Sequence, residues 1–542
     1  MSGRLLKSTA VFSAMTFLSR ISGLVRDQVY AQVFGASAAM DAFVVAFRIP
    51  NFLRRLSAEG SFSMAFVPVL AEYKAKGDAA AVKALVDRVA GALIAALLVV
   101  TGLALVLAPW VMRVFAPGFA PGSEQAELAT LMLQITFPYA LFISLAALAG
   151  GILNSYQRFA IPALSPILLN LSMIAAALCL APRMRGWGYE PVLALAWGVF
   201  AAGILQLAFQ LPSLARLGLL PRPRLDLAHA GVRKILRLMV PTLFGSSVAQ
   251  VNLLFNTLAA SLLMGGSVTW LYYSDRLLEF PLGMFGVAIG TVILPHLSGR
   301  HAAEDAQGYS RSLDWGFRLC LLIGVPACLG LILCAQPLLA TLFQYGRFSE
   351  LDTRMSSLSL VAQATAVPAF LLVKVLAPAF YSRQDTRTPV KAALASIAIN
   401  IACAAALFAA LLWLTPTGRA ALAAADGRWL AALKDVEGAH ALLALAIAVA
   451  GWANALQLWG YLRRARVYRL QPGWGRFLRQ LLVASLAMAA AVLALRLQWA
   501  DWTPWSWLER GWRLGVLVGA GAGAYAAGLL LMGYRPRELR GQ

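Results

Sequence analysis

The chain has 542 residues, of which 60% are hydrophobic and only 13% are charged. Soluble domains carry about 25% charged residues, so this composition excludes an ordinary soluble protein and places the chain in a membrane. The formal net charge of +22 would suggest a nucleic-acid partner in a soluble protein. Here most of the excess falls in short loops, where basic residues orient the chain and meet anionic membrane lipids, so no nucleic acid is expected.

Hydropathy and helix-breaking residues predict an all-α polytopic membrane protein with about 14 transmembrane helices. The alternating ten-residue segments of an outer-membrane barrel are missing. Residues 1–19 lack a small-residue cleavage site, which favours a retained first helix over a removed signal. The predicted spans are 7–33, 38–71, 84–114, 125–153, 159–181, 190–213, 232–263, 267–298, 313–335, 354–382, 388–414, 438–462, 475–497 and 510–533.

The loops alternate in charge along the chain. Basic residues concentrate at 74–88, 216–234, 383–391 and 463–476, whereas 115–127 and 264–267 contain no Lys or Arg. The loops at 182–189 and 415–437 carry some basic residues and weaken the contrast. The positive-inside rule predicts an even number of helices with both termini cytoplasmic. The cluster of five tryptophans between 499 and 512 is expected to form an interfacial belt on the outer side.

An internal repeat organises the predicted helices. Prolines recur in the same order in both halves of the chain, each separated from its counterpart by 227 to 231 residues, and Gln157 corresponds in the same way to Gln384. Each copy holds six predicted helices, an even number, so the copies form two parallel six-helix lobes, an arrangement linked to alternating access. The predicted lobes are 1–220 and 221–465, and 466–542 adds two C-terminal helices without a counterpart. The proline pairs are Pro50/Pro281, Pro68/Pro295, Pro109/Pro337, Pro138/Pro368 and Pro162/Pro389.

Charged residues cluster in the first two predicted helices, although a charge inside a bilayer costs roughly 2.5–3.5 kcal/mol. Asp41, Arg48 and Arg55 share a stripe of 38–71, because a step of seven residues drifts only about 20° around a helix. Arg20 and Asp27 share a side of 7–33 in the same way, and Arg26 is expected to point elsewhere. The whole set comprises Arg20, Arg26, Asp27, Asp41, Arg48, Arg54, Arg55 and Glu59.

The second lobe carries charges at the corresponding place, with Asp275, Arg276 and Glu279 in the predicted helix 267–298. Arginines outnumber acids in the combined set, and their guanidinium groups bind phosphate oxygens in a bidentate manner. The sequence therefore predicts a chamber for an anion, most plausibly a phosphate or pyrophosphate. The alternative is that the charges only pair with each other to fix helix packing. Lys374 is a further charge within a predicted helix, with a role in countering charge or in packing.

Motifs for catalysis are missing from the sequence. It contains no GxxxxGK[ST], HExxH or GxSxG, and its five cysteines and four histidines form no spacing typical of a metal site. We therefore expect a transporter that is not an enzyme, with no cofactor and no metal, driven by an ion gradient, the membrane potential or the substrate gradient.

Several long motifs resemble the bacterial lipid II flippase family, MurJ (MviN), of the multidrug/oligosaccharidyl-lipid/polysaccharide exporter superfamily. They include LLKSTAVFSAMTFLSRISGLVRD and FGASAAMDAFVVAFRIPNFLRRLSAEG near the N-terminus. SVTWLYYSDRLLEFPLGMFGVAIGTVILP at 267–295 and VKVLAPAFYSRQDTRTPVK at 373–391 extend the resemblance over nearly the whole chain. It is weakest at 415–437 and in the last two helices.

The resemblance implies a fold of two six-helix lobes with two added C-terminal helices. It also implies a function: passing undecaprenyl-pyrophosphate-linked disaccharide-pentapeptide, lipid II, from the cytoplasmic to the periplasmic leaflet of the inner membrane for cell-wall synthesis. Proteins of cell-wall synthesis are candidate partners. The substrate-binding residues that it implies are Arg20, Arg26, Asp41, Arg54, Arg55, Asp275, Arg276 and Glu279.

Within this set, the resemblance assigns Arg26, Arg55 and Arg276 to the pyrophosphate, and Asp41 and Glu279 to positioning and gating. No acidic residue lies in 232–263, 388–414 or 438–462, so membrane potential is preferred to sodium as the driving force. Two other functions remain open: an ion-coupled exporter of drugs or polysaccharide lipids from the same superfamily, and a non-transporting membrane scaffold for cell-wall enzymes.

Overall fold

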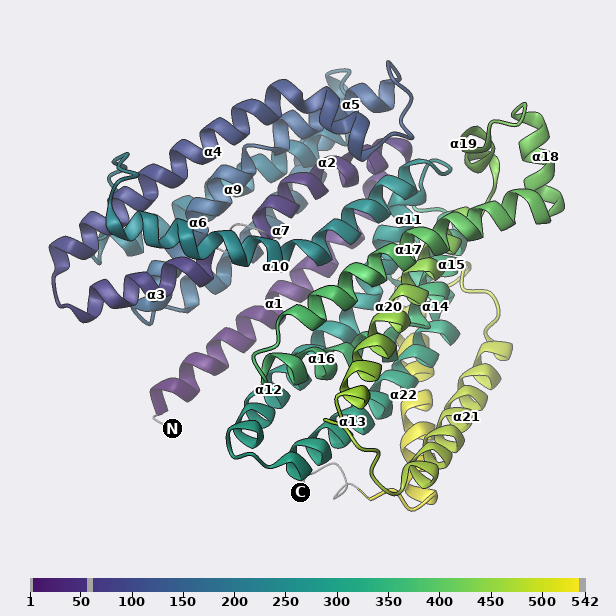
Figure 1. Cartoon of the computed structure of the whole chain (residues 1–542). Helices are drawn as coiled ribbons and strands as arrows, with labels where there is room; N and C mark the ends of the chain where they lie inside the picture. The colour runs from purple at the N-terminus through teal and green to yellow at the C-terminus, as the bar shows by residue number, and fades with distance from the viewer. Residues whose placement is uncertain (1–2, 56–61, 536–542) are drawn as a thin grey trace. The chain divides into compact units, whose positions relative to one another are not determined.

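The computed structural model describes residues 3–55 and 62–535, without the side chains of 3–14, 16, 240–249, 287, 288 and 291. Glu59 of the predicted charged stripe lies outside the described residues. The described part consists of helices joined by loops, as predicted, and contains no strand (Figure 1). Contacts divide the chain into two compact units, residues 1–268 (unit 1) and 269–542 (unit 2).

Unit 1 is built from long apolar helices. Polar caps mark where several of them begin: the side chains of Ser37, Asp78 and Ser123 accept hydrogen bonds from the first turns of α2, α4 and α5. Helix α1 packs on α7, α2 on α5, and α6 on α9. The helices are α1 (Gly3–Phe34), α2 (Ala38–Arg54), α3 (Phe62–Ala75), α4 (Ala79–Phe115), α5 (Glu124–Thr136), α6 (Tyr139–Ser155), α7 (Ala160–Ala175), η2 (Ala176–Leu180), α8 (Ala181–Gly186), α9 (Leu193–Ala215) and α10 (Ala230–Ser261).

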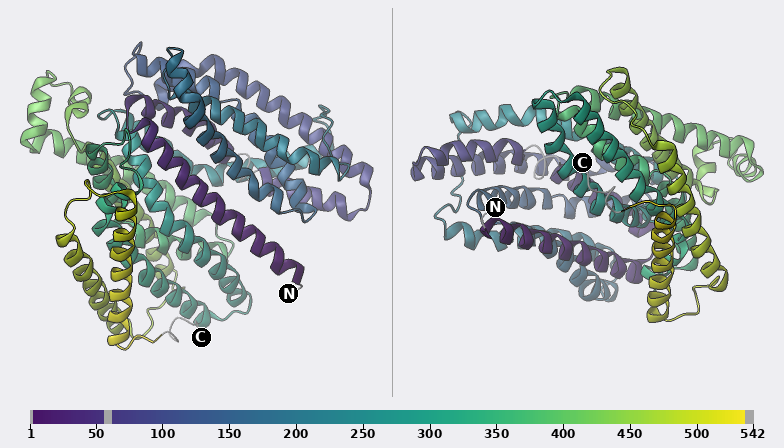
Figure 2. Two further views of the ribbon diagram at one scale, coloured as in Figure 1. Left: turned by 180° about the vertical axis from the view of Figure 1, so that it is seen from behind. Right: turned by 90° about the horizontal axis from the view of Figure 1, so that it is seen from below.

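Unit 2 has its main core around α13, α16 and α20, and α21 lies alongside α22 (Figure 2). A capping box at Ser349 and Asp352 starts α15, and a second one at Ser506 and Glu509 starts α22. The helices are α11 (Ser267–Pro281), η3 (Leu282–Gly286), α12 (Val287–Ala302), α13 (Ala306–Leu333), α14 (Ala335–Leu342), α15 (Glu350–Ala364), α16 (Val367–Tyr381), α17 (Arg387–Leu414), α18 (Pro416–Ala424), α19 (Trp429–Ala432), η4 (Leu433–Asp435), α20 (Ala439–Arg464), α21 (Trp474–Gln498) and α22 (Trp507–Leu531).

Nine helices of the described residues are long and apolar enough to cross a membrane. A tenth span arises if α15 and α16, which meet at a bend of 42°, count as one. The chain is therefore a multi-pass membrane protein. The predicted number of 14 spans is not confirmed, because the search for apolar spans covers only the described residues.

The backbone repeats where the sequence repeats. Gln157 and Gln384 both adopt the left-handed conformation, each at φ 60°, directly after α6 and α16. In both places a short motif closes the helix, since Arg158 N–H donates to Leu153 O and Asp385 N–H donates to Phe380 O. A side chain rarely adopts positive φ, so the agreement of two glutamines separated in the sequence supports an internal repeat.

Helix α10 belongs to unit 1 by its packing, because it contacts α2, α3 and α4. The lobes predicted from the repeat, 1–220, 221–465 and 466–542, are defined by sequence correspondence and not by compactness, so they stay a prediction.

The loop before α10 is hydrogen-bonded to α4. Arg88 donates to Asp226 at 2.9 Å, and this hydrogen bond holds the pKa of the Asp226 carboxyl below its usual range.

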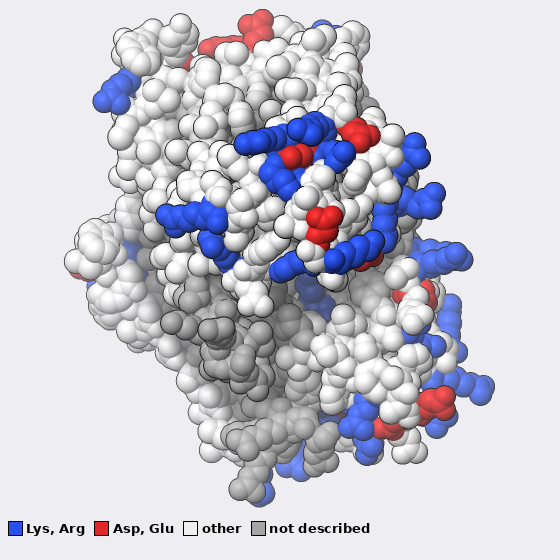
Figure 3. Space-filling model, turned by 90° about the vertical axis from the view of Figure 1, so that its left-hand side faces the viewer, with Lys and Arg blue, Asp and Glu red and all other residues white. Residues whose placement is uncertain are grey.

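Basic side chains are exposed near the ends of α3, α4 and α10, among them Lys74, Lys76, Arg224, Arg233 and Lys234. Figure 3 shows Lys and Arg gathered on one face, with acidic side chains among them. Lys234 pairs with Glu72 at 2.6 Å. Surface charges of this kind suit anionic lipid heads.

The tryptophans predicted as a belt differ in exposure. Trp507 is 67% exposed, whereas Trp502 is 2% exposed and packs in a small core with Leu517. The belt prediction is therefore wrong for Trp502, because the segment between α21 and α22 folds back on its own helices.

Candidate anion-binding site

A buried ion pair lies on α1 in unit 1. Arg26 donates to Oδ1 of Asp27 through Nε at 2.9 Å and through Nη2 at 2.6 Å. Its Nη1 donates to Oδ1 of Asn170 on α7 at 3.0 Å. The side chains of Arg26 and Asp27 are 8% and 0% exposed. All three guanidinium nitrogens are thus engaged, which is what a buried charge requires.

Asn170, on α7, links this ion pair and the backbone of α1. Its Nδ2 donates to Ser22 Oγ at 2.8 Å and to Ser19 O at 3.2 Å, so one amide joins α7 to α1 on the side where Arg26 lies. The Arg26 guanidinium also lies 5.5 Å from the centre of the Tyr30 ring, within the range of a cation–π interaction.

The expected orientation of Arg26 is wrong. Arg20 is exposed and Asp27 is fully buried, so the two do not share one environment although they share a helical side. Arg26 instead reaches across to Asp27, because its long side chain spans the angle between neighbouring residues of a helix.

Charges on α2 contact α10 and the turn that follows it. Asp41 is 2% exposed, and its Oδ2 accepts a hydrogen bond of 2.6 Å from the backbone N–H of Gly266. Arg48, one stripe position further, donates to the hydroxyl of Thr257 on α10. The predicted stripe is confirmed for these two residues, which find their partners on one side of α2.

Arg54 and Arg55 end α2 and are half-buried. Arg54 Nε donates to Oδ1 of Asn51 at 2.8 Å, a bond within one turn of the helix. The backbone N–H of Arg55 donates to the carbonyls of Asn51 and Phe52. Pro50 lies inside α2, one turn before this end.

In unit 2, the charges of α11 are less buried. Arg276 and Glu279 form an ion pair of 3.2 Å with side chains 31% and 59% exposed. Arg276 Nη2 also donates to the Tyr272 hydroxyl at 3.3 Å, and its guanidinium lies 5.6 Å from the Tyr272 ring centre. Asp275 accepts a hydrogen bond of 2.9 Å from Gln363 on α15.

Sequence reasoning missed the neutral partners of these charges. Asn170, Thr257 and Gln363 each bind one of the singled-out charged residues from a helix far away in the sequence. The sequence gives a weak indication for one of them. Asn170 is a single amide in a largely apolar run, where an unpaired polar group would be costly, so a partner is expected.

Each unit thus holds its own group of charges, and every cation among the site residues is an arginine. The forked guanidinium groups match phosphate geometry, whereas neutral or cationic ligands would gain little from them. Among the described residues, no group of three or more His, Cys, Asp or Glu side chains is arranged to hold a metal ion. Lys374 on α16 is exposed, and its methylenes lie against Gly286 of η3.

Comparison of the sequence with known proteins gives one family. The family model "Lipid II flippase MurJ" matches residues 30–433. "Probable lipid II flippase MurJ" of Vibrio cholerae is 42% identical, covering 99% of this chain and 98% of its own length. "Lipid II flippase MurJ" of Burkholderia cenocepacia is 41% identical, covering 92% of this chain and 91% of its own length.

Solved structures agree on the fold. "Lipid II flippase MurJ, inward closed conformation" superposes with a TM-score of 0.75 at 24% identity, covering 96% of this chain and 98% of its own. An inward-facing multidrug resistance MATE family transporter of the MOP superfamily superposes with a TM-score of 0.63 at 14% identity, covering 84% of this chain and 98% of its own. By the family model and the relatives from Vibrio cholerae and Burkholderia cenocepacia, the chain belongs to the lipid II flippase MurJ family.

Proposed function

We propose that this protein flips lipid II from the cytoplasmic to the periplasmic leaflet of the bacterial inner membrane by alternating access. One observation carries the proposal: relatives named as lipid II flippases are 41–42% identical over at least nine-tenths of both chains. In this proposal the protein transports lipid II and catalyses no reaction. Both of its termini lie on the cytoplasmic side.

The charges that the sequence singles out act on the pyrophosphate of this substrate. Arg55 and Arg276 bind it, and Arg26 binds it once its hydrogen bonds to Asp27 and Asn170 open, with Arg20 and Arg54 adding positive potential. Asp41, Asp275 and Glu279 hold the arginines or exchange with the phosphates as the protein changes state. The support is chemical, because a forked guanidinium binds two phosphate oxygens at once.

The excess of arginine also argues against export of cationic drugs. A cavity for cations needs acidic or aromatic walls, and like charges in a site cost several kcal/mol. The membrane potential suits a protein whose α10, α17 and α20 contain no Asp or Glu.

Arg276 gives the sharpest test, because it is partly exposed and its removal spares the core. We expect Arg276→Ala to lower the arrival of lipid II at the periplasmic face at least about tenfold, as a charge-assisted hydrogen bond contributes roughly 1.5–3 kcal/mol. Arg276→Lys tests the fork, since it keeps the charge but loses the planar geometry. Membrane insertion of each variant is measured in parallel.

Arg354→Ala is the matched control, because Arg354 forms a comparable exposed pair of 3.5 Å with Glu437 in the same unit. The control is expected to flip lipid II normally. Equal activity of Arg276→Ala and Arg354→Ala would remove Arg276 from the substrate site. A scaffold function would be favoured instead if all arginine variants of the site kept normal flipping.

A further inference from the structure

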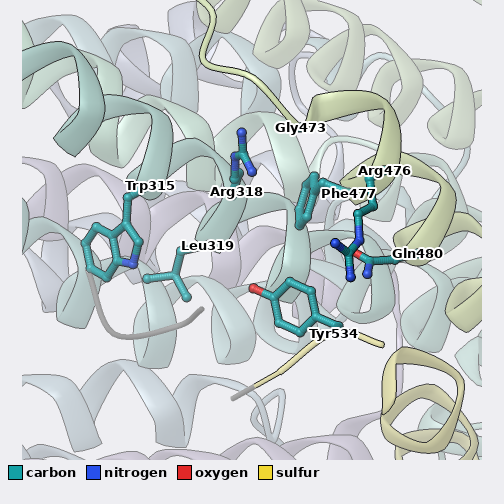
Figure 4. A pocket seen from close by; sticks show the side chains of 8 residues that line it. All are labelled: Trp315, Arg318, Leu319, Gly473, Arg476, Phe477, Gln480 and Tyr534. Carbon is teal, nitrogen blue, oxygen red and sulfur yellow. The ribbon is translucent and has the colours of Figure 1, made fainter. Parts of the chain in front are cut away.

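A cavity of about 240 Å³ lies within unit 2, and none of the residues assigned above to lipid II lines it. Its walls come from α13, from the first turns of α21 and from the segment after α22 (Figure 4). Drug-sized ligands occupy pockets of about 300–1,000 Å³, so this one suits a smaller chemical group. The side chains that matter are Trp315, Arg318, Arg476, Phe477, Gln480 and Tyr534.

Arg318 forms a fixed positive wall. Its Nε donates to Oδ2 of Asp314 at 2.8 Å, and its Nη2 donates to Pro472 O at 2.8 Å. The rings of Trp474 and Phe477 flank the guanidinium at 5.3 and 5.7 Å. Two nitrogens are therefore committed to the protein, and Nη1 is left for the cavity.

Asp314 pairs with Arg318 at 2.8 Å and offsets part of its charge, but it does not line the cavity. It is 4% exposed, and its other oxygen accepts hydrogen bonds of 2.7 Å each from the Tyr468 hydroxyl and Trp474 Nε1. Both oxygens are thus held on the protein side of Arg318.

Arg476 supplies a second, adjustable charge. It is exposed, and its Nη2 makes only a long hydrogen bond of 3.4 Å to Gly533 O. Figure 4 shows it beside Gln480, which lies one turn further along α21 and donates to Met532 O at 3.0 Å. Of the described residues that line the cavity, none is acidic. A single weak bond leaves the guanidinium able to turn toward a ligand.

The amino end of α21 adds to the positive potential. Gly473 is its N-cap and offers no side chain to cap the first turn, at the end where the helix dipole favours anions. Exposed leucines follow on the same helix, with Leu478 48% and Leu482 59% exposed, as expected of a surface that contacts lipid.

We propose that this cavity binds a phosphate group, carried by the headgroup of an anionic phospholipid or by a soluble phosphate compound. Two arginines from different helices and an uncapped helix end face one small space, with aromatic rings beside them for the neighbouring carbon atoms. None of the residues assigned to lipid II lines this space, so the site is separate from that of the transported substrate.

The test measures binding to the purified full-length protein in detergent. One arm counts bound phosphatidylglycerol by native mass spectrometry, with phosphatidylcholine as the zwitterionic reference. The other arm measures inorganic phosphate by equilibrium dialysis. We expect Arg476→Ala to weaken binding about tenfold, corresponding to the loss of one charge-assisted hydrogen bond, and Arg476→Lys to weaken it less.

Arg479→Ala is the matched control, since Arg479 is an exposed arginine of the same helix that does not line the cavity. It should bind like the unchanged protein. A loss of phosphatidylglycerol confined to Arg476→Ala supports a lipid ligand, and a loss confined to inorganic phosphate supports a soluble one. Equal effects of Arg476→Ala and Arg479→Ala, or no effect in either arm, would overturn the proposal. Thermal unfolding checks the variants, and Arg476→Gln replaces any that fails to fold.

Discussion

Helices α1 and α2 in unit 1 and helix α11 in unit 2 carry the charges singled out from the sequence but hold them differently. Arg26 and Asp27 are almost completely buried, and Asp41 is fixed to a backbone N–H. Arg276 and Glu279 are 31% and 59% exposed and form a longer ion pair. The comparison teaches that one part of the charged set belongs to the packed core, whereas the other part lies closer to solvent.

This difference decides what a substitution measures. Removing one partner of a buried ion pair leaves an uncompensated charge, which destabilises the fold strongly. Removing one partner of an exposed pair changes stability little, because water already solvates both groups. Loss of transport in unit 1 therefore needs a parallel stability measurement before it can be assigned to substrate binding.

The largest effect is expected for Arg26→Ala. It leaves Asp27 buried without its guanidinium, and we expect a loss of about 3–5 kcal/mol in the free energy of unfolding. Thermal or denaturant unfolding in detergent measures it, with Arg276→Ala in unit 2 as the more exposed comparison.

The double variant Arg26→Ala/Asp27→Asn is the control, because it removes both charges together. It should recover much of the lost stability. If Arg26→Ala were no more destabilising than Arg276→Ala, the contrast between the two units would be wrong.

A medium effect is expected for Asp41→Ala. The Gly266 N–H would lose its acceptor in a buried place, which costs about 1.5–3 kcal/mol for a hydrogen bond to a charged group. Asp501→Ala removes a similar bond to the Thr503 N–H at an exposed site and should cost much less. Equal melting temperatures for the two variants would show that Asp41 does not anchor the turn before α11.

The sequence predicted the parts of this arrangement that depend on local spacing. Helical ranges, the repeat, the stripe of Asp41 and Arg48 and the closeness of Arg276 to Glu279 all follow from periodicity. The neutral partners did not, because Asn170 lies 144 residues from Arg26 and Gln363 lies 88 residues from Asp275. Such pairs are set by helix packing, which one sequence does not encode in its periodicity.

A smaller effect, equal in both halves, is expected at the left-handed residues Gln157 and Gln384. Replacing either with Gly should raise stability by about 1 kcal/mol, because glycine adopts positive φ without the cost of a Cβ. Unfolding in detergent measures each variant, and Gln134→Gly, inside α5, is the control that should lower stability. A gain at one glutamine and a loss at the other would argue against equivalent turns in the two repeats.

The smallest effect is expected for Glu279→Gln. The pair with Arg276 is exposed enough that its loss should change the free energy of unfolding by less than about 1 kcal/mol, since Arg276 keeps its bond to Tyr272. Asp27→Asn in unit 1 is the matched comparison and should cost more, because Arg26 would then be buried beside a neutral amide. Unfolding of both variants in the same detergent decides the order. If Glu279→Gln were the more destabilising variant, the charges of α11 would contribute to the fold at least as much as those of α1. The proposal that Arg276 and Glu279 change partners during transport would then be contradicted.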